Sequence, residues 1–156
     1  SSLVVVGELN PLGVDPRYAL YDLPERSSGY RLRTLVMGVR RTTYNRIKKL
    51  NLCTGEWSVP AARDRAWDVE VENPGSVLVL LGRRVWAAFG AEEFAHVVGR
   101  SEPFTLRHDS SGLNRYLLLP HPSGLNREWN DPASVDRARA LLREVSPETP
   151  WGELTG

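Results

Sequence analysis

The chain has 156 residues, of which 41% are hydrophobic and 25% are charged. This is enough apolar material for one hydrophobic core but too short for two ordinary domains, so we expect a single domain over residues 1–156. The formal charge of +1 comes from 20 basic and 19 acidic side chains. It excludes a global positive field that would by itself indicate a nucleic-acid partner, and it leaves room for a local basic face.

The single cysteine restricts disulfide and metal chemistry. Cys53 cannot form an intramolecular disulfide, and one thiolate cannot hold a zinc ion or an iron-sulfur cluster without other ligands. No apolar run approaches the ~20 residues that a membrane span needs, and the chain starts in a short hydrophobic run without a basic leader. We therefore expect a soluble, cytoplasmic, monomeric protein with no metal, no cofactor and no membrane partner.

Four short aliphatic runs that end on turn or polar residues predict buried strands. The second run is interrupted by Lys48 and Lys49 and is the weakest of the four. The predicted strands cover residues 3–6, 47–53, 77–81 and 116–119.

Helical patterns lie between and after these runs. The clearest is the last, which has Asp131 as its cap, Pro132 in its first turn and one apolar face. The polar residues 99–114 predict a surface excursion without regular structure. The earlier helical patterns cover residues 30–39, 61–69 and 85–89, with a possible further turn at 92–98.

Wholly apolar strands that alternate with helices are typical of a parallel sheet covered on both faces. We therefore predict an α/β fold, a three-layer α/β/α sandwich with a central, mainly parallel four-stranded sheet. In such folds the functional groups gather at the carboxyl ends of the strands.

Two predicted strands run directly into proline-stiffened turns that carry polar side chains. The first leads into Leu9-Asn10-Pro11, and the fourth leads into His121-Pro122-Ser123-Gly124-Leu125. This pair resembles the two signature motifs of the uracil-DNA glycosylase superfamily, and residues 77–81 followed by Gly82 resemble the third strand of that family with its trailing glycine. The resemblance extends from Leu3 to the end of the final helix.

The resemblance implies hydrolysis of the bond between a flipped-out base and its sugar, with DNA that contains a damaged or modified base as the partner. In it, Asn10 takes the position that holds the attacking water, and His121 the position that donates a hydrogen bond to the departing base. Asn10 differs from the aspartate of the main uracil-excising branch, because an amide cannot accept a proton as a carboxylate can. His121 resembles that main branch, so the chain combines features of two branches.

Glu8 offers an alternative to Asn10. One branch of the superfamily has a glutamate directly after the motif glycine, as Gly7-Glu8 does here. In that register Glu8 is the residue that activates water. A solvated carboxylate at a strand end is the other interpretation.

Three further residues are candidates for binding the base. Asn51, near the end of the second strand, can donate and accept at a pyrimidine edge, although it can also satisfy backbone groups of a turn. Tyr21 or Tyr18 can stack on the base, and both can equally be packing residues.

The segment after His121 is the candidate DNA contact. The resemblance makes Leu125 a wedge that fills the vacated base stack, with Arg127 beside it and Ser123 on a phosphate. A basic cluster between residues 40 and 49 can bind the DNA backbone or form a solvated face. No function is assigned to His96 or His108, because no carboxylates or cysteines stand at ligand spacing around them.

Two other functions remain open at this stage. The same pocket can hydrolyse free nucleotides without meeting a duplex, or it can recognise modified bases without cleaving them. The sequence does not name the base, which can be uracil, a deaminated purine or a modified pyrimidine.

Overall fold

The computed structural model of the chain describes residues 3–10, 19–23, 25, 27–90, 105–108, 114–123 and 127–153, with the backbone alone at residues 10 and 105–108. The described strands form one sheet in the order β2-β1-β3-β5-β4. The first four strands in this order are parallel, and β4 pairs with β5 in the antiparallel direction. The strands are β1 (Leu3–Asn10), β2 (Lys48–Thr54), β3 (Val77–Leu81), β4 (Thr105–His108) and β5 (Arg115–Leu119).

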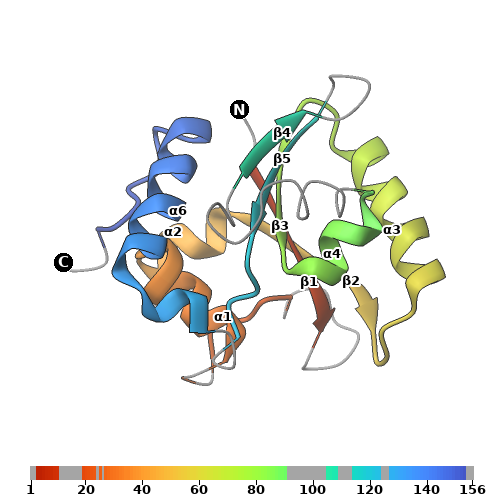
Figure 1. The fold of residues 1–156 in the computed structure, drawn as a ribbon, viewed down its shortest axis with the longest axis horizontal. Helices are drawn as coiled ribbons and strands as arrows, with labels where there is room; N and C mark the ends of the chain where they lie inside the picture. Colours follow the sequence, from red (N-terminus) through yellow and green to blue (C-terminus); the bar gives the residue numbers. More distant parts are fainter. Residues whose placement is uncertain are drawn as a thin grey trace.

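Helices cover both faces of this sheet, which confirms the predicted three-layer α/β arrangement (Figure 1). One face is covered by α1 (Ser28–Arg31), η2 (Leu32–Met37), α2 (Arg41–Arg46) and α6 (Pro132–Val145). The other face is covered by α3 (Val59–Glu72) and α4 (Arg83–Ala88). A short 3₁₀ helix, η3 (Arg127–Asn130), precedes α6. Among the described residues, no helix is both long and apolar enough to span a membrane.

Strand β3 explains why its sequence is apolar at every position. Val77, Val79 and Leu81 pack into the core beneath α6 and η2, whereas Leu78 and Leu80 pack into the core beneath α3 and α4. All five residues are fully buried. A strand between two helical layers cannot present a polar face, so it loses the alternation of a half-exposed strand.

Two features of the sheet differ from the sequence-based expectation. Strand β1 does not end at Val6 but continues to Asn10, because the chain goes on pairing with β2 as far as Asn10 and Thr54. Glu8 and Asn10 therefore belong to the C-terminal part of β1 and not to the loop that follows it. Strand β4 lies within the polar excursion predicted for residues 99–114, and its pairing with β5 needs only backbone groups.

The helices follow the sequence patterns with two exceptions. The predicted helix at residues 30–39 is a short α-helix that continues as a π-helix to Met37, where Gly38 with φ of 62° ends it. Helix α2 was not predicted, because Tyr44 is its only buried residue and the segment has no apolar stripe. The final helix begins as predicted, with the Asp131 side chain accepting from the N–H of Ala133 at 2.9 Å.

Candidate active site

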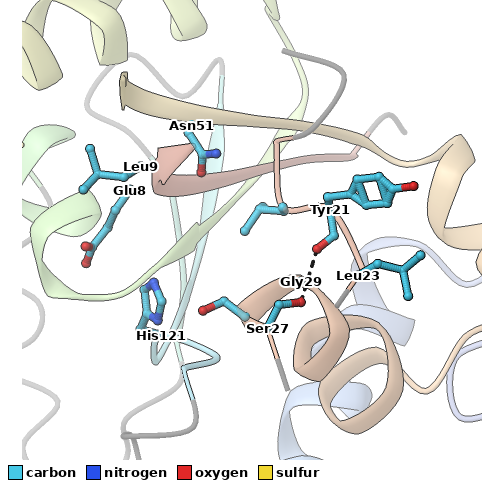
Figure 2. A pocket seen from close by; sticks show the side chains of 10 residues that line it. Glu8, Leu9, Tyr21, Leu23, Ser27, Gly29, Asn51 and His121 are labelled. Carbon is cyan, nitrogen blue, oxygen red and sulfur yellow. Dashed lines mark hydrogen bonds between the residues drawn. The ribbon is translucent and has the colours of Figure 1, made fainter. Parts of the chain in front are cut away.

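A cavity of about 290 Å³ opens at the carboxyl ends of the parallel strands. Glu8 enters it from β1, Asn51 from β2, and His121 from the segment after β5 (Figure 2). One cavity therefore contains three polar residues singled out in the sequence, although Glu8 and His121 lie more than 110 positions apart in the chain. We call it the base cavity, after the ligand that the sequence resemblance implies. Its lining residues are Glu8, Leu9, Leu20, Tyr21, Leu23, Ser27, Ser28, Gly29, Asn51 and His121.

Gly82 provides the space in which Glu8 and His121 approach each other. It follows β3, which separates β1 from β5 in the sheet, and its backbone has φ of 91° and ψ of 160°. A Cβ atom at this position would lie 3.2 Å from Cβ of His121 and 3.4 Å from Oε1 of Glu8. Both the backbone conformation and the crowded surroundings therefore favour glycine here.

The hydrogen bonds of His121 fix its tautomer. The backbone N–H of Ser123 donates to Nδ1 over 3.0 Å, so Nδ1 is an acceptor and the proton of the neutral ring is on Nε2. Burial lowers the pKa of His121 below its usual value of 6.5, while the Glu8 carboxylate raises it. The carbonyl of His121 accepts from the indole N–H of the buried Trp129 at 3.1 Å, which holds the segment against η3.

Glu8 and His121 also line a second cavity, of about 370 Å³, whose lining residues do not include Asn51. We call it the Arg84 cavity. Arg84 lies here with its guanidinium 4.0 Å from the Glu8 carboxylate. The Glu8 and His121 pair thus forms a partition between the two cavities. The remaining lining residues of the Arg84 cavity are Gly82, Arg83, Trp86, Pro120 and Glu128.

Asn51 carries a buried amide whose Oδ1 and Nδ2 atoms both lack a hydrogen-bond partner among the described residues. Its Oδ1 lies over Gly7, where any side chain would collide with it. Leaving such groups unpaired costs about 1 to 3 kcal/mol each, so a buried amide of this kind calls for an explanation. A ligand in the base cavity that both donates and accepts hydrogen bonds would provide one.

The wall opposite Glu8 is formed by residues 19–23, which two contacts hold in place. Leu20 has a positive φ of 52°, and its carbonyl accepts from the Tyr44 hydroxyl at 2.5 Å. Gly29 packs directly beneath the carbonyls of Leu20 and Tyr21, where a Cβ atom has no room. Tyr21 lines the cavity from this turn, and its carbonyl lies 3.4 Å from the Ser27 hydroxyl.

The structure leaves several predicted site residues without a test. Tyr18 and Leu125 lie outside the described residues, and so does the side chain of Asn10. Arg127 is exposed at the start of η3, near the segment that carries His121. Ser123 takes part in the site through its backbone N–H.

Sequence reasoning missed the residues that shape the base cavity without reacting in it. Ser27 and Gly29 lie just before the helical pattern predicted for residues 30–39, and Ser27 caps the observed helix, because its hydroxyl accepts from the N–H of Tyr30 at 3.1 Å. The glycine was the available signal for a close backbone approach. The other missed residues are Leu9, Leu20, Leu23 and Ser28.

Within the described part of the chain, no group of three or more His, Cys, Asp or Glu side chains is arranged to hold a metal ion. Glu8, His121 and Asn51 bring one carboxylate, one imidazole and one amide to the base cavity. No family model matches the chain, and no curated protein or solved structure matches it either.

Proposed function

We propose that the protein hydrolyses the N-glycosidic bond of a base held in the base cavity, as expected from the resemblance to the uracil-DNA glycosylase superfamily. The observation that carries this proposal is the partnerless amide of Asn51 in the same cavity as Glu8 and His121. A purely structural asparagine would have partners for its buried Oδ1 and Nδ2 atoms.

The cavity supports recognition of a planar base with a polar edge. Leu9, Leu20 and Leu23 provide apolar walls, and Asn51 offers one donor and one acceptor side by side. A uracil-like ring presents the complementary acceptor and donor along one edge. Tyr21 is the aromatic side chain of the wall and the candidate for contact with the ring face.

His121 is suited to stabilise the departing base. As the bond between C1′ of the sugar and the base nitrogen breaks, the electron pair moves to the base, which becomes anionic. The Nε2–H of His121 donates a hydrogen bond to that developing charge. The ring stays neutral, because it donates this hydrogen bond without transferring its proton to the base. The base later takes its proton from solvent.

Glu8 is suited to activate the water. The water oxygen forms the new bond to C1′, and its proton passes to the Glu8 carboxylate, which has the guanidinium of Arg84 4.0 Å away. This assigns to Glu8 the role that the first motif gives to Asn10, which remains a second candidate for holding the water. The products are a free base and an abasic sugar.

The proposed substrate is DNA with a flipped-out uracil-like, deaminated or modified base. A cavity of about 290 Å³ is at the lower limit for small-molecule sites, which favours entry of the base alone with its sugar outside. Leu125, Ser123 and Arg127 follow or flank the site along the chain and are the proposed DNA contacts.

The experiment that tests this proposal measures release of the free base by mass spectrometry. Duplex and single-stranded oligonucleotides and free nucleotides, each with uracil, hypoxanthine or a 5-substituted uracil, are incubated with the wild type, with Glu8→Gln and with Glu72→Gln. We expect release from at least one oligonucleotide by the wild type and by the Glu72→Gln control, and a loss in Glu8→Gln. Release from free nucleotides only would identify a nucleotide hydrolase, and binding without release would identify a recognition module.

A further inference from the structure

A third cavity, of about 390 Å³, lies beside the base cavity. Tyr21 lines both cavities, and the chain segment 19–22 runs from one to the other. We call this the Lys49 cavity; its lining residues are Ala19, Tyr21, Asp22, Arg41, Tyr44, Asn45 and Lys49.

Strand β2 carries a side chain into each of these two cavities. Lys49 and Asn51 are two positions apart, so they project from the same face of the strand at a spacing of about 7 Å. Lys48, directly before Lys49 at the start of β2, projects to the opposite face and donates to Oδ1 of Asn73 at 2.7 Å. The base reader and the Lys49 ammonium are therefore neighbours on one surface.

The described residues that line or border the Lys49 cavity carry more positive than negative charge. Its carboxylate, Asp22, is buried and is contacted by Nε of Arg33 and by Nε of Arg41, each at 2.9 Å. These two guanidinium groups outnumber the single Asp22 carboxylate, and Lys49 adds a further positive charge. Among the described residues, Lys49 forms no ion pair.

Lys49 is held in place rather than free to reach solvent. Its Nζ donates to the carbonyls of Tyr44 at 2.6 Å and Ile47 at 2.7 Å, and it lies 4.3 Å from the centre of the Tyr44 ring. These contacts use two of its three N–H groups. Burial lowers the pKa of Lys49 to about 8, although the charge of Asp22 raises it, so the ammonium lacks full compensation for the water it has lost.

We propose that the Lys49 cavity binds an anionic group, a carboxylate or a phosphate, of the same substrate whose base occupies the base cavity. The third N–H of Lys49 and the exposed guanidinium of Arg41, whose side chain is 52% exposed, are the donors for this group. That the anion belongs to the hydrolysed substrate rests on the proposed function, whereas anion binding itself does not. The anion has two possible sources, an acidic substituent on the base or a phosphate of the nucleotide chain.

The first test measures the Lys49 ammonium directly. The protein is labelled with [¹³Cε]lysine, the Lys49 signal is assigned by its loss in Lys49→Gln, and inorganic phosphate replaces chloride at constant ionic strength. We expect phosphate to raise the pKa of Lys49, because an anion favours the charged form, and to shift amide signals of residues 44–50 in the wild type and in Lys48→Gln but not in Lys49→Gln. An unchanged Lys49 pKa, or equal shifts in Lys49→Gln, would overturn the site.

The second test separates the two sources. Oligonucleotides carry uracil, uracils with a carboxylate on one to three methylenes at position 5, and the matching methyl esters. If the base carries the anion, Lys49→Gln slows release of an acidic base by roughly 10- to 100-fold and leaves its ester unchanged. If a backbone phosphate is bound, Lys49→Gln weakens the binding of all substrates to a similar extent and reduces the salt dependence of that binding.

Failure of the two proposals can be told apart. If the wild type releases no base from any substrate, the proposed hydrolysis is wrong, and the phosphate titration still decides whether the Lys49 cavity binds anions. If base is released and Lys49→Gln matches the wild type on every substrate, the anion bound in the Lys49 cavity does not belong to the hydrolysed substrate. Lys48→Gln is the matched control throughout, since it removes the same charge from the opposite face of β2.

Discussion

The backbone N–H of Ser123 donates to Nδ1 of His121 over 3.0 Å, and this contact leaves Nε2 as the protonated nitrogen of the neutral ring. The fold thus presents a fixed N–H donor to the base cavity, without requiring the ring to be charged. The intervening Pro122 stiffens the connection between the two residues, and its carbonyl accepts from Nε of Arg31 at 2.9 Å.

Replacing His121 by alanine is expected to lower the rate of base release by about 10² to 10³ in single turnovers, because one preorganised donor to a developing anion is lost. Binding of substrate DNA should change little, since the contact strengthens only as charge develops. Rapid-quench measurement of base release, together with a binding titration, checks both parts. A variant that cleaves as fast as the wild type would remove His121 from the mechanism.

The free energy of unfolding should fall as the pH drops below 6.5. Burial holds the pKa of folded His121 below 6.5, so the unfolded chain takes up the proton more readily. The stabilising contribution is therefore complete above pH 6.5 and is lost as the pH falls through the pKa of the folded state. Urea unfolding of the wild type and of His121→Asn across pH 5 to 8 should show a steeper loss for the wild type; parallel curves would contradict the expectation.

Gly82→Ala should damage both stability and activity. The φ and ψ of Gly82 belong to a region that only glycine occupies readily, which costs an alanine about 1 to 3 kcal/mol. The new methyl group would also lie 3.2 Å from Cβ of His121, which is tighter than ordinary van der Waals contact, so His121 would have to shift. Gly75→Ala is the control, because Gly75 has φ of 76° and open space around it, so it should lose stability and keep activity.

Asn51→Ala is expected to separate function from stability. Removing two buried, partnerless polar atoms should leave the free energy of unfolding unchanged or increase it. Loss of two hydrogen bonds to the base should lower kcat/KM by roughly 10- to 100-fold. Thermal unfolding and steady-state kinetics measure the two effects, and a clearly destabilised variant would indicate that Asn51 has a structural partner.

Leu125→Ala should weaken activity on duplex DNA much more than on single strands, because only a duplex leaves a gap in the base stack for an apolar wedge to fill. The comparison uses one oligonucleotide with and without its complement, at the same salt concentration. Equal losses on both substrates would argue against insertion of Leu125.

The predictability of the fold follows the amount of apolar burial in each element. Strand β3 was located to the residue because all its side chains are buried. Helix α2 and strand β4 were missed because α2 buries only Tyr44 and β4 is joined to β5 through backbone pairing. Hydrophobic periodicity cannot detect a helix that buries one side chain, or a strand that is defined by its backbone pairing.

The candidate site also contains residues that the sequence predicted and residues that it did not. Glu8, Asn51 and His121 were found because each follows or ends an apolar strand, and parallel strands bring such ends together. The turn at Leu20 and the close approach of Gly29 depend on contacts between distant segments, which no local pattern encodes. The basic cluster at residues 40–49 was seen as one unit, but Lys48 and Lys49 face opposite sides of the sheet.

The position of β1 in the sheet has a consequence for how the chain folds. This strand comes first in the chain but lies between β2 and β3, and Leu3 pairs with Val77, more than 70 residues later. During synthesis the edge of β1 that pairs with β3 stays unpaired until β3 has left the ribosome. Unpaired apolar strands are prone to aggregation. Such long-range parallel pairing also slows folding. The Glu8 end of the site therefore cannot assemble until the middle of the chain has been made.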